Sequence, residues 1–566
     1  MASYKHAGAI RAPQLVGMHG PGAIVNLERL SVMPMDPQLW PTSRGLIESP
    51  TFARQIAADA LIDTASLTKS GIPTTLFPRM FVCRECGIIQ RHDRPHADEL
   101  QQGLRCVHGD GALYPSRWIV YCERGHIDDF DYFGFLHRST CRGTVTLVSG
   151  ASLSDTIVRC ATCGESRPML EAYSHVKRGH CTGRRPWMGR GAIDCDATPR
   201  LSMRSASDVY FAAIRSAITI EPEADPDYRK IMQYLGPLDT DREYAVDLLH
   251  RHAEFSRLPE HVIQRAIDIV LDKRDMPYRD RLGEEFVSFC SPSGNQRSDL
   301  WIEEVLPDDY RRFGISQVMA VRKLREVRAI VGFQRGALPL DPTFTHDDAG
   351  TQPISGLGDS RQFPAYENRG EGIFVRLESR KLAEFLGRPN IKDRARMFRD
   401  AEEKLRGAAS APFHVPLRAL YVLTHSLAHL AIRQLSLTCG YSQSSLRERI
   451  FVGPDDAAEP WAGFLVYTSS SDADGSLGGV VAQALDGKFA SLLERGMLEL
   501  GVCSSDPVCA LQLPNQFRKV NAAACHNCLI LPETCCERNN RYLDRIMSVP
   551  ATVNERSDDL CFIKPV

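Results

Sequence analysis

The sequence predicts a multidomain α+β protein, with small ribbon-like modules near the N-terminus, a mainly helical middle and a C-terminal α/β domain. The chain has 566 residues, and domains usually have about 100–200 residues, so several units are expected. A hydrophobic fraction of 43% and a charged fraction of 24% are typical of chains with packed cores. Most of the 18 cysteines fall in clusters with metal-ligand spacing, which indicates zinc-ribbon-like modules.

Charge and the N-terminus give only general expectations. The formal net charge is −2, so whole-chain charge neither favours nor opposes binding to nucleic acid. The first residues lead into no apolar export signal, and no run reaches the roughly 18 uncharged apolar residues of a membrane span. A cytoplasmic location is therefore expected. Disulfides are rare there, so the clustered cysteines are predicted to bind zinc.

Two zones make up the N-terminal part of the chain. The segment 1–70 contains a Gly20-Pro21-Gly22 turn followed by an apolar run. The region 71–220 is rich in Cys and His, with short strands predicted at 118–121 and 144–148. Modules of this kind have thin cores, so a bound ion is expected to supply folding energy.

The third zone, 221–406, is predicted to be mainly helical. In 315–333 the apolar residues fit a helical period, and basic residues fall between them. This pattern predicts a helix with a basic face. The stretch 340–372 is rich in Gly, Pro and Asp and is predicted to be a long loop.

The fourth zone, 407–566, is predicted to be an α/β domain. It begins with a strongly apolar helix at 417–437 and continues through a strand at 463–467. A second helix, at 480–500, leads into the last cysteine cluster.

The first two predicted metal sites each consist of Cys and His residues that are close together in the sequence. Zinc favours about four S or N ligands in a tetrahedron, and a CxxC turn presents two thiolates to one ion. The first predicted site consists of Cys83, Cys86, Cys106 and His108, with Cys122 as an alternative fourth ligand. The second predicted site consists of Cys122, His126, His137 and Cys141.

Two further clusters contain mostly cysteine. The third predicted site consists of Cys160, Cys163, Cys181 and Cys195. The fourth lies near the C-terminus and has more thiols than one ion needs: Cys503, Cys509, Cys525, Cys528 and the adjacent pair Cys535 and Cys536. One of the adjacent pair is expected to be spare, and the spacing does not decide which four bind. Thiolate-rich sets are usually closed, so structural rather than catalytic zinc is expected.

His425 and His429 are one helical turn apart on the predicted apolar helix. The pattern is similar to a metalloprotease helix but lacks its general-base Glu, so a buried structural pair is predicted. Asp472 and Asp474 are similar to half of a calcium loop without its later Glu, and a polar turn is predicted. The alternative function built from these four residues is a zinc-assisted nuclease.

Two local groups of residues favour DNA binding. Basic side chains neutralise phosphates, and aromatic faces stack on bases. The first group lies in a span without acidic residues and consists of Lys177, Arg178, Arg184, Arg185, Trp187 and Arg190. The second group lies on the predicted basic face and consists of Arg322, Lys323, Arg325 and Arg328. No Walker A or kinase motif occurs, so no ATP hydrolysis by this chain is expected.

Several motifs together resemble known families. Those in the C-terminal part are Thr424-His425-Ser426-Leu427-Ala428-His429-Leu430, Cys525-His526-Asn527-Cys528 and Pro532-Glu533-Thr534-Cys535-Cys536. They resemble the MrfA-type zinc-binding domain, which occurs attached to or beside helicases. Farther upstream, Gly20-Pro21-Gly22-Ala23-Ile24-Val25, Phe77-Pro78-Arg79 and Gly125-His126-Ile127-Asp128-Asp129-Phe130 extend the similarity to the DrmB family of the DISARM anti-phage system.

This resemblance implies a non-catalytic, zinc-binding subunit. Members of the DrmB family pair with the helicase DrmA, the complex engages foreign DNA, and a DNA methyltransferase of the system marks self. The family implies no catalytic residue, so the partner is expected to hydrolyse ATP. A protein-only scaffold that never touches DNA is a further alternative.

Overall fold

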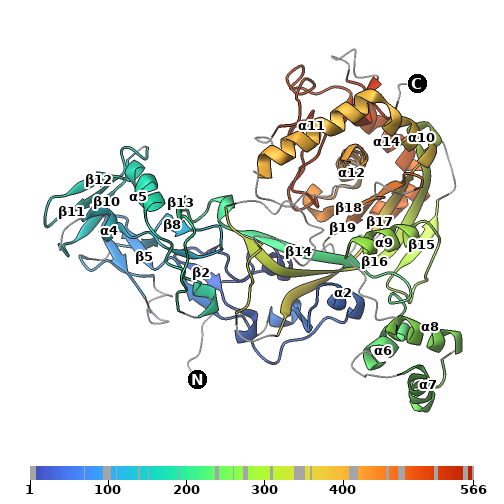
Figure 1. The fold of residues 1–566 in the computed structure, drawn as a ribbon, viewed down its shortest axis with the longest axis horizontal. Coiled ribbons are helices and arrows are strands. Elements are labelled where there is room, and N and C mark those ends of the chain that lie inside the picture. Colours follow the sequence, from blue (N-terminus) through green and yellow to red (C-terminus); the bar gives the residue numbers. More distant parts are fainter. Residues whose placement is uncertain are drawn as a thin grey trace.

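The computed structural model describes residues 8–68, 70–93, 103–109, 111–137, 141–150, 152–189, 191–235, 241–258, 260–271, 278–305, 310–336, 351–356, 360–406, 418–453, 458–469, 478–515, 520–551 and 559–563. The molecule is elongated (Figure 1). The Cys/His-rich modules lie at one end and the C-terminal helices at the other. Two long strands run between these ends.

A seven-stranded sheet forms the spine of the molecule. Its order is β14-β16-β17-β19-β18, with β15 added on β16 and β3 on β17. The β3–β17 pair is parallel and the other pairs are antiparallel. The strands are β3 (Ala60–Asp63), β14 (Phe211–Ile218), β15 (Trp301–Glu304), β16 (Ile315–Gln334), β17 (Gln362–Leu377), β18 (Leu446–Val452) and β19 (Ala462–Thr468).

The helix predicted at 315–333 is wrong, because this segment is strand β16. Val318 and Ala320 enter the core under the C-terminal helices, while Met319 and Val321 enter a second core on the opposite face. The side chains therefore alternate with the period of a strand. Both faces are buried, so apolar residues follow one another without the polar alternation that marks a half-buried strand. The predicted loop at 340–372 is also too long, since β17 begins at Gln362; residues 337–350 and 357–359 lie outside the described ranges.

The C-terminal helices pack on one face of the sheet and α9 on the other. The predicted helix at 417–437 and the predicted strand at 463–467 are confirmed as α12 and β19. The helix predicted at 480–500 is two helices, which separate at Gly487 with φ +70°. The helices are α9 (Tyr278–Phe289), α10 (Ser379–Gly387), α11 (Pro389–Arg406), α12 (Arg418–Cys439), α13 (Gly479–Leu485), α14 (Lys488–Leu500) and α15 (Arg545–Ser548).

Three small sheets form the opposite end of the molecule, and they confirm the strands predicted at 118–121 and 144–148. Their orders are β6-β5-β7, β13-β8-β9 and β10-β11-β12. The elements are β5 (Met80–Cys83), β6 (Ile89–Arg91), β7 (Leu113–Pro115), β8 (Trp118–Tyr121), β9 (Ile127–Asp129), α4 (Tyr132–Leu136), β10 (Val145–Val148), β11 (Ile157–Cys160), β12 (Ser166–Pro168), α5 (Ala172–Arg178) and β13 (Arg200–Met203).

The N-terminal segment packs beneath the centre of the spine. Val16, Phe52 and Leu61 share a core with Val327 and Phe333 of β16. The predicted turn has Gly22 at φ +85°, with Trp187 and Phe333 close to it. The elements are α1 (Ala12–Val16), β1 (Val25–Asn26), β2 (Ser31–Pro34), α2 (Pro50–Gln55) and β4 (Thr74–Leu76).

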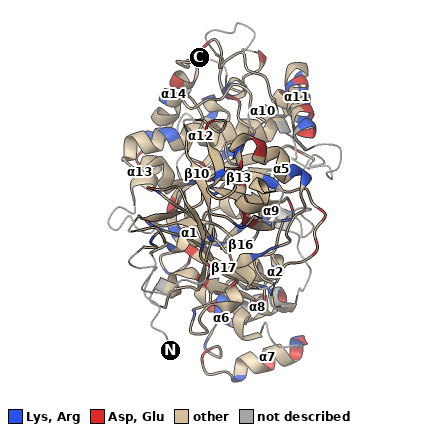
Figure 2. Cartoon of the chain, turned by 90° about the vertical axis from the view of Figure 1, so that its left-hand side faces the viewer, with Lys and Arg blue, Asp and Glu red and all other residues tan. Residues whose placement is uncertain are grey.

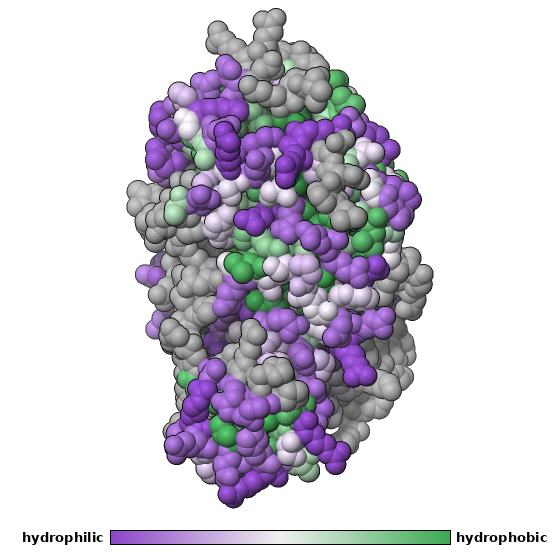
Figure 3. All heavy atoms as spheres, turned by 90° about the vertical axis from the view of Figure 1, so that its right-hand side faces the viewer, coloured by the Kyte–Doolittle hydropathy of each residue, from purple (hydrophilic) through white to green (hydrophobic). Residues whose placement is uncertain are grey.

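Three helices form a separate small core beside α9 and β15 (Figure 1). They are α6 (Pro226–Leu235), α7 (Arg242–Arg251) and α8 (Glu260–Leu271). The face in Figure 3 is mostly hydrophilic at this end, and its hydrophobic patches are small and separated. Among the described residues, no helix combines the length and apolar character that a membrane crossing needs.

Candidate metal centres

Side chains with metal-ligand chemistry meet in five groups among the described residues. In each group the candidate ligand atoms all lie within 4.8 Å of one another. The groups are Cys122, His126, Cys181 and Cys195; His137, Cys141, Cys160 and Cys163; Cys83, Cys86 and Cys106; Cys503, Cys509, Cys525 and Cys528; and His425, His429, Glu448 and Cys536.

The sulfur separations fit metal binding and not disulfides. The Cys503–Cys525 sulfurs are 3.4 Å apart, the Cys509–Cys528 sulfurs 3.7 Å and the Cys122–Cys195 sulfurs 4.0 Å. A disulfide requires about 2.05 Å. A tetrahedron with Zn–S bonds of about 2.3 Å places two sulfurs about 3.8 Å apart. The donor sets therefore fit zinc, and every cysteine is a free thiol.

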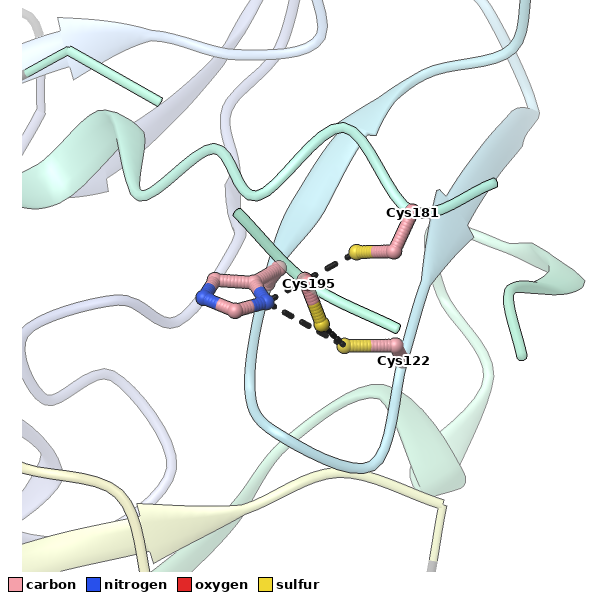
Figure 4. Close-up of side chains that lie close together, drawn as sticks. Cys122, Cys181 and Cys195 are labelled. Atoms are coloured by element: carbon pink, nitrogen blue, oxygen red, sulfur yellow. Dashed lines mark hydrogen bonds between the residues drawn. The ribbon is translucent and has the colours of Figure 1, made fainter. Parts of the chain in front are cut away.

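The first group corrects the predicted pairing of Cys122 and His126 with His137 and Cys141. The β8–β9 hairpin places Cys122 and His126 opposite Cys181 and Cys195, as Figure 4 shows for the three cysteines. Nδ1 of His126 lies 3.4 Å from the Cys122 sulfur and 3.6 Å from that of Cys181. A hydrogen bond from the Cys181 thiol lowers the pKa of Cys122 to about 5, so a thiolate is available at neutral pH.

In the second group, His137 and Cys141 meet Cys160 and Cys163. The predicted set Cys160, Cys163, Cys181 and Cys195 is therefore wrong as well. His137 follows α4, and Cys141 precedes β10. Strand β11 pairs with β10 and brings Cys160 to them, with its sulfur 3.9 Å from that of Cys141. The backbone N–H of Cys163 is the main cause that lowers the pKa of Cys160 to about 6. Ligand spacing alone cannot reveal such an interleaved pairing, because either combination has the same local motifs.

In the third group, Cys83 and Cys86 lie at the β5–β6 turn, where Gly87 has φ +70°, and Cys106 comes from the segment between β6 and β7. His108 is not part of the described group, although its backbone N–H donates to the Cys106 sulfur at 3.5 Å. Cys122, the predicted alternative, is part of another group. The described residues therefore give this site three thiols.

The spacing left open which four C-terminal cysteines form one site. In the structure, five of the six thiols divide between two groups. Cys503, Cys509, Cys525 and Cys528 form the four-cysteine group. A hydrogen bond from Cys528, followed by the charge of Arg545, lowers the pKa of Cys509 to about 6. The adjacent pair splits: the Cys535 sulfur donates to the Gln443 carbonyl at 2.9 Å, and Cys536 meets the two histidines of α12.

The last group confirms that His425 and His429 are a buried pair, each 0% exposed. Glu448 of β18 and Cys536 complete it. Sequence reasoning missed Glu448, because a carboxylate on a strand near the middle of the domain carries no spacing signal. Asp472 and Asp474 lie outside the described residues.

The first predicted DNA-binding group is only partly exposed. Lys177 and Arg178 are exposed at the end of α5, whereas Arg184 and Arg185 are half-buried. Arg184 lies 3.4 Å from Asp128. Trp187 is fully buried and packs on Phe333, so its prediction as a base-stacking residue is wrong. Arg190 lies outside the described residues.

The second predicted DNA-binding group is engaged in ion pairs along β16. Arg325 is 2% exposed and donates to Glu367 at 2.7 Å, so its prediction as a DNA contact is wrong. Arg328 pairs with Glu326 at 3.2 Å. Arg322 and Lys323 are partly exposed, and they lie 2.6 Å from Glu303 and 3.8 Å from Asp299, respectively.

Comparisons with known proteins fit these centres. The MrfA Zn-binding domain family matches residues 427–529, which include His429, Glu448 and all four thiols of the four-cysteine group. A domain of unknown function, DUF8724, matches residues 11–211, which include the groups that contain Cys83, Cys122 and Cys141. The DISARM protein DrmB of Bacillus paralicheniformis is 28% identical, over 84% of this chain and 89% of the relative. The chain thus contains an MrfA Zn-binding domain, and along most of its length it is similar to the DISARM protein DrmB.

Proposed function

We propose that this protein is a zinc-stapled, non-catalytic subunit of a DISARM-type anti-phage defence complex, where it binds DNA and partners a DrmA-type helicase. The observation that carries the proposal is the 28% identity to DrmB over 84% of the chain. Four thiolate-rich groups along the same span support it, because they provide the rigid modules that such a subunit needs. A DNA methyltransferase of the system is a further expected component of the complex.

The ligand sets favour a structural role for the metal. A catalytic zinc has three protein ligands and an open position for water or substrate. Three of the four thiolate-rich groups have four protein ligands, and the His425 group is buried. These sets leave no described site for metal-bound water at the two histidines, which disfavours the nuclease alternative.

A pair of assays on the purified full chain separates the subunit from an enzyme. We expect no ATP turnover by the chain alone, and ATP turnover by a complex that forms when a DrmA-type helicase is added. DNA incubated with the chain and zinc should stay intact for both the wild type and His429→Ala. ATP turnover by the chain alone, or DNA cleavage that His429→Ala abolishes, would contradict the proposal.

The exposed basic end of α5 is the proposed DNA contact. Lys177 and Arg178 lie in its last turn, and Tyr173 is 44% exposed on the same helix. Basic residues in a last turn also complement the helix dipole, which is the alternative role for these side chains. Figure 2 looks at this end of the molecule and shows basic residues on α5. Because the helix has no acidic residue, phosphate contact is the role proposed for Lys177 and Arg178.

Filter binding of duplex DNA over a salt series tests this contact. Each lost phosphate contact should reduce the slope of log affinity against log salt by roughly 0.9. The double variant Lys177→Glu with Arg178→Glu should therefore bind more weakly and with a smaller slope. Lys392→Glu with Arg396→Glu on α11 is the matched control, because it makes the same charge change on exposed residues of another helix. Equal losses in both variants would assign the effect to net charge alone.

A further inference from the structure

Four side chains with metal-ligand chemistry meet inside the C-terminal domain, away from any surface. His425 and His429 come from successive turns of α12, Glu448 from β18, and Cys536 from the segment that follows the four-cysteine group. Their exposed fractions are 0%, 0%, 1% and 7%. Polar groups buried to this extent require partners that satisfy them.

The distances between the four side chains match one shared centre. Nε2 of His425 lies 2.9 Å from Oε1 of Glu448 and 3.1 Å from the Cys536 sulfur. Nε2 of His429 lies 3.4 Å from Oε2 of Glu448. Tetrahedral zinc with bonds of about 2.0–2.3 Å has neighbouring ligand atoms roughly 3.3–3.8 Å apart. The observed separations are close to these values.

The hydrogen bonds around His429 aim a lone pair at the centre. Its Nδ1 lies 2.8 Å from the Leu529 carbonyl, which can only accept, so the proton is on Nδ1. In the neutral imidazole that a metal ligand requires, Nε2 then carries a lone pair. Nε2 of His429 and Oε2 of Glu448 face each other at 3.4 Å, yet neither has a hydrogen-bond partner among the described residues. Two acceptors that point at one place are the arrangement a cation requires.

The fourth side chain is held as a ligand would be. The Cys536 sulfur accepts the backbone N–H groups of Arg538 at 3.4 Å and Asn540 at 3.2 Å. Such donors stabilise a thiolate. One thiolate, one carboxylate and two neutral imidazoles carry a charge of −2, which a divalent cation cancels. Without the cation, Oε2 of Glu448 would stay buried without a hydrogen-bond partner among the described residues.

We propose that His425, His429, Glu448 and Cys536 bind one divalent transition-metal ion, with zinc as the best match, at a closed structural site separate from the four-cysteine centre. Imidazole and thiolate ligands exclude magnesium and calcium, which take oxygen ligands. Four protein ligands leave no open coordination position. The ion ties α12 to β18 and to the C-terminal segment. It also adjoins the four-cysteine centre, because the carbonyl that orients His429 belongs to the residue after Cys528.

The adjacent cysteines provide a matched pair of variants for the full-length protein. Cys535 and Cys536 are both buried, but only Cys536 is in the group. Elemental analysis of the folded, monodisperse protein should show one metal ion per chain fewer in Cys536→Ala than in the wild type. Cys535→Ala should keep the wild-type metal content. A folded Cys536→Ala protein with unchanged metal content would overturn the proposal.

A measurement on the wild type keeps the proposal testable if Cys536→Ala does not fold. Diffraction data collected above the zinc edge should give an anomalous peak among the four side chains, in addition to the peak at the four-cysteine group. A peak at the four-cysteine group and none among His425, His429, Glu448 and Cys536 would overturn the proposal. These outcomes are independent of DNA binding and of helicase partnership.

Discussion

Arg335 illustrates how single residues join the parts of this molecule. Its guanidinium is 2% exposed and donates to the carbonyls of Gly22, Gly125 and Val209 at 2.6–2.9 Å. It also lies over the ring of Phe333, 4.7 Å from its centroid. Gly125 is in the turn between two ligands of the first metal group. One side chain therefore connects the N-terminal turn, the metal module and the end of β16.

Replacing Arg335 should destabilise these three contacts together. Arg335→Met leaves three buried carbonyls without their donor, and each unsatisfied group costs about 1–3 kcal/mol. We expect a loss of about 3 kcal/mol or more in the urea-unfolding free energy of the N-terminal half, measured by tryptophan fluorescence. Arg380→Met is the control: Arg380 is 86% exposed, so its loss should stay within about 0.5 kcal/mol. Similar midpoints for both variants would contradict this account of Arg335.

The sequence predicted which residues lie in metal groups better than it predicted which of them share one group. Of the cysteines predicted as candidate ligands, all except Cys535 lie in metal groups, but the pair Cys122 and His126 and the pair Cys160 and Cys163 each have the partners predicted for the other. The prediction that basic residues of β16 contact DNA was wrong at Arg325 for a similar reason. Arg325 pairs with Glu367, 42 residues away, and its burial depends on the whole sheet. Local spacing reports ligand chemistry, whereas tertiary pairing depends on strand register.

At the scale of elements, the sequence predicted segments with clear ends correctly, and it failed where a strand is buried on both faces. The strands β8 and β19 and the helix α12 were predicted because their apolar runs are bounded by clear turn residues. Strand β16 was mistaken for a helix because several of its apolar residues also fit a helical period. The error comes from a sheet that separates two cores, which gives the strand no polar face.

The second of those cores depends on a group of aromatic side chains. Phe374 of β17 lies 5.4 Å from Phe289, 5.8 Å from Phe286 and 5.9 Å from Phe451, measured between ring centroids. Phe374→Ala should cost about 3–5 kcal/mol, because the cavity would remain partly open. The urea-unfolding midpoint measures this loss. Leu498→Ala, at a position 74% exposed on α14, should leave the midpoint almost unchanged. A tolerated Phe374→Ala would show that α9 does not depend on this packing.

On the scale of the whole molecule, two kinds of folding support coexist. The spine and the C-terminal helices have large apolar cores. The Cys/His-rich end has three-stranded sheets with short strands, and one of its cores contains mainly Phe81, Ile88 and Leu113 beside two thiols. Cores this small need a further source of free energy, which bound metal supplies. We therefore expect these modules to fold around their metal ions.

Hydrogen exchange of the full-length protein, with and without a strong zinc chelator, reports whether folding of these modules depends on metal. Metal removal should abolish the protection of the backbone amides in β5, β8, β10 and β11. The paired strands β16 and β17 should keep their protection where they border the large apolar cores. Protein that is shown to be metal-free and yet keeps full protection across the Cys/His-rich end would contradict the account.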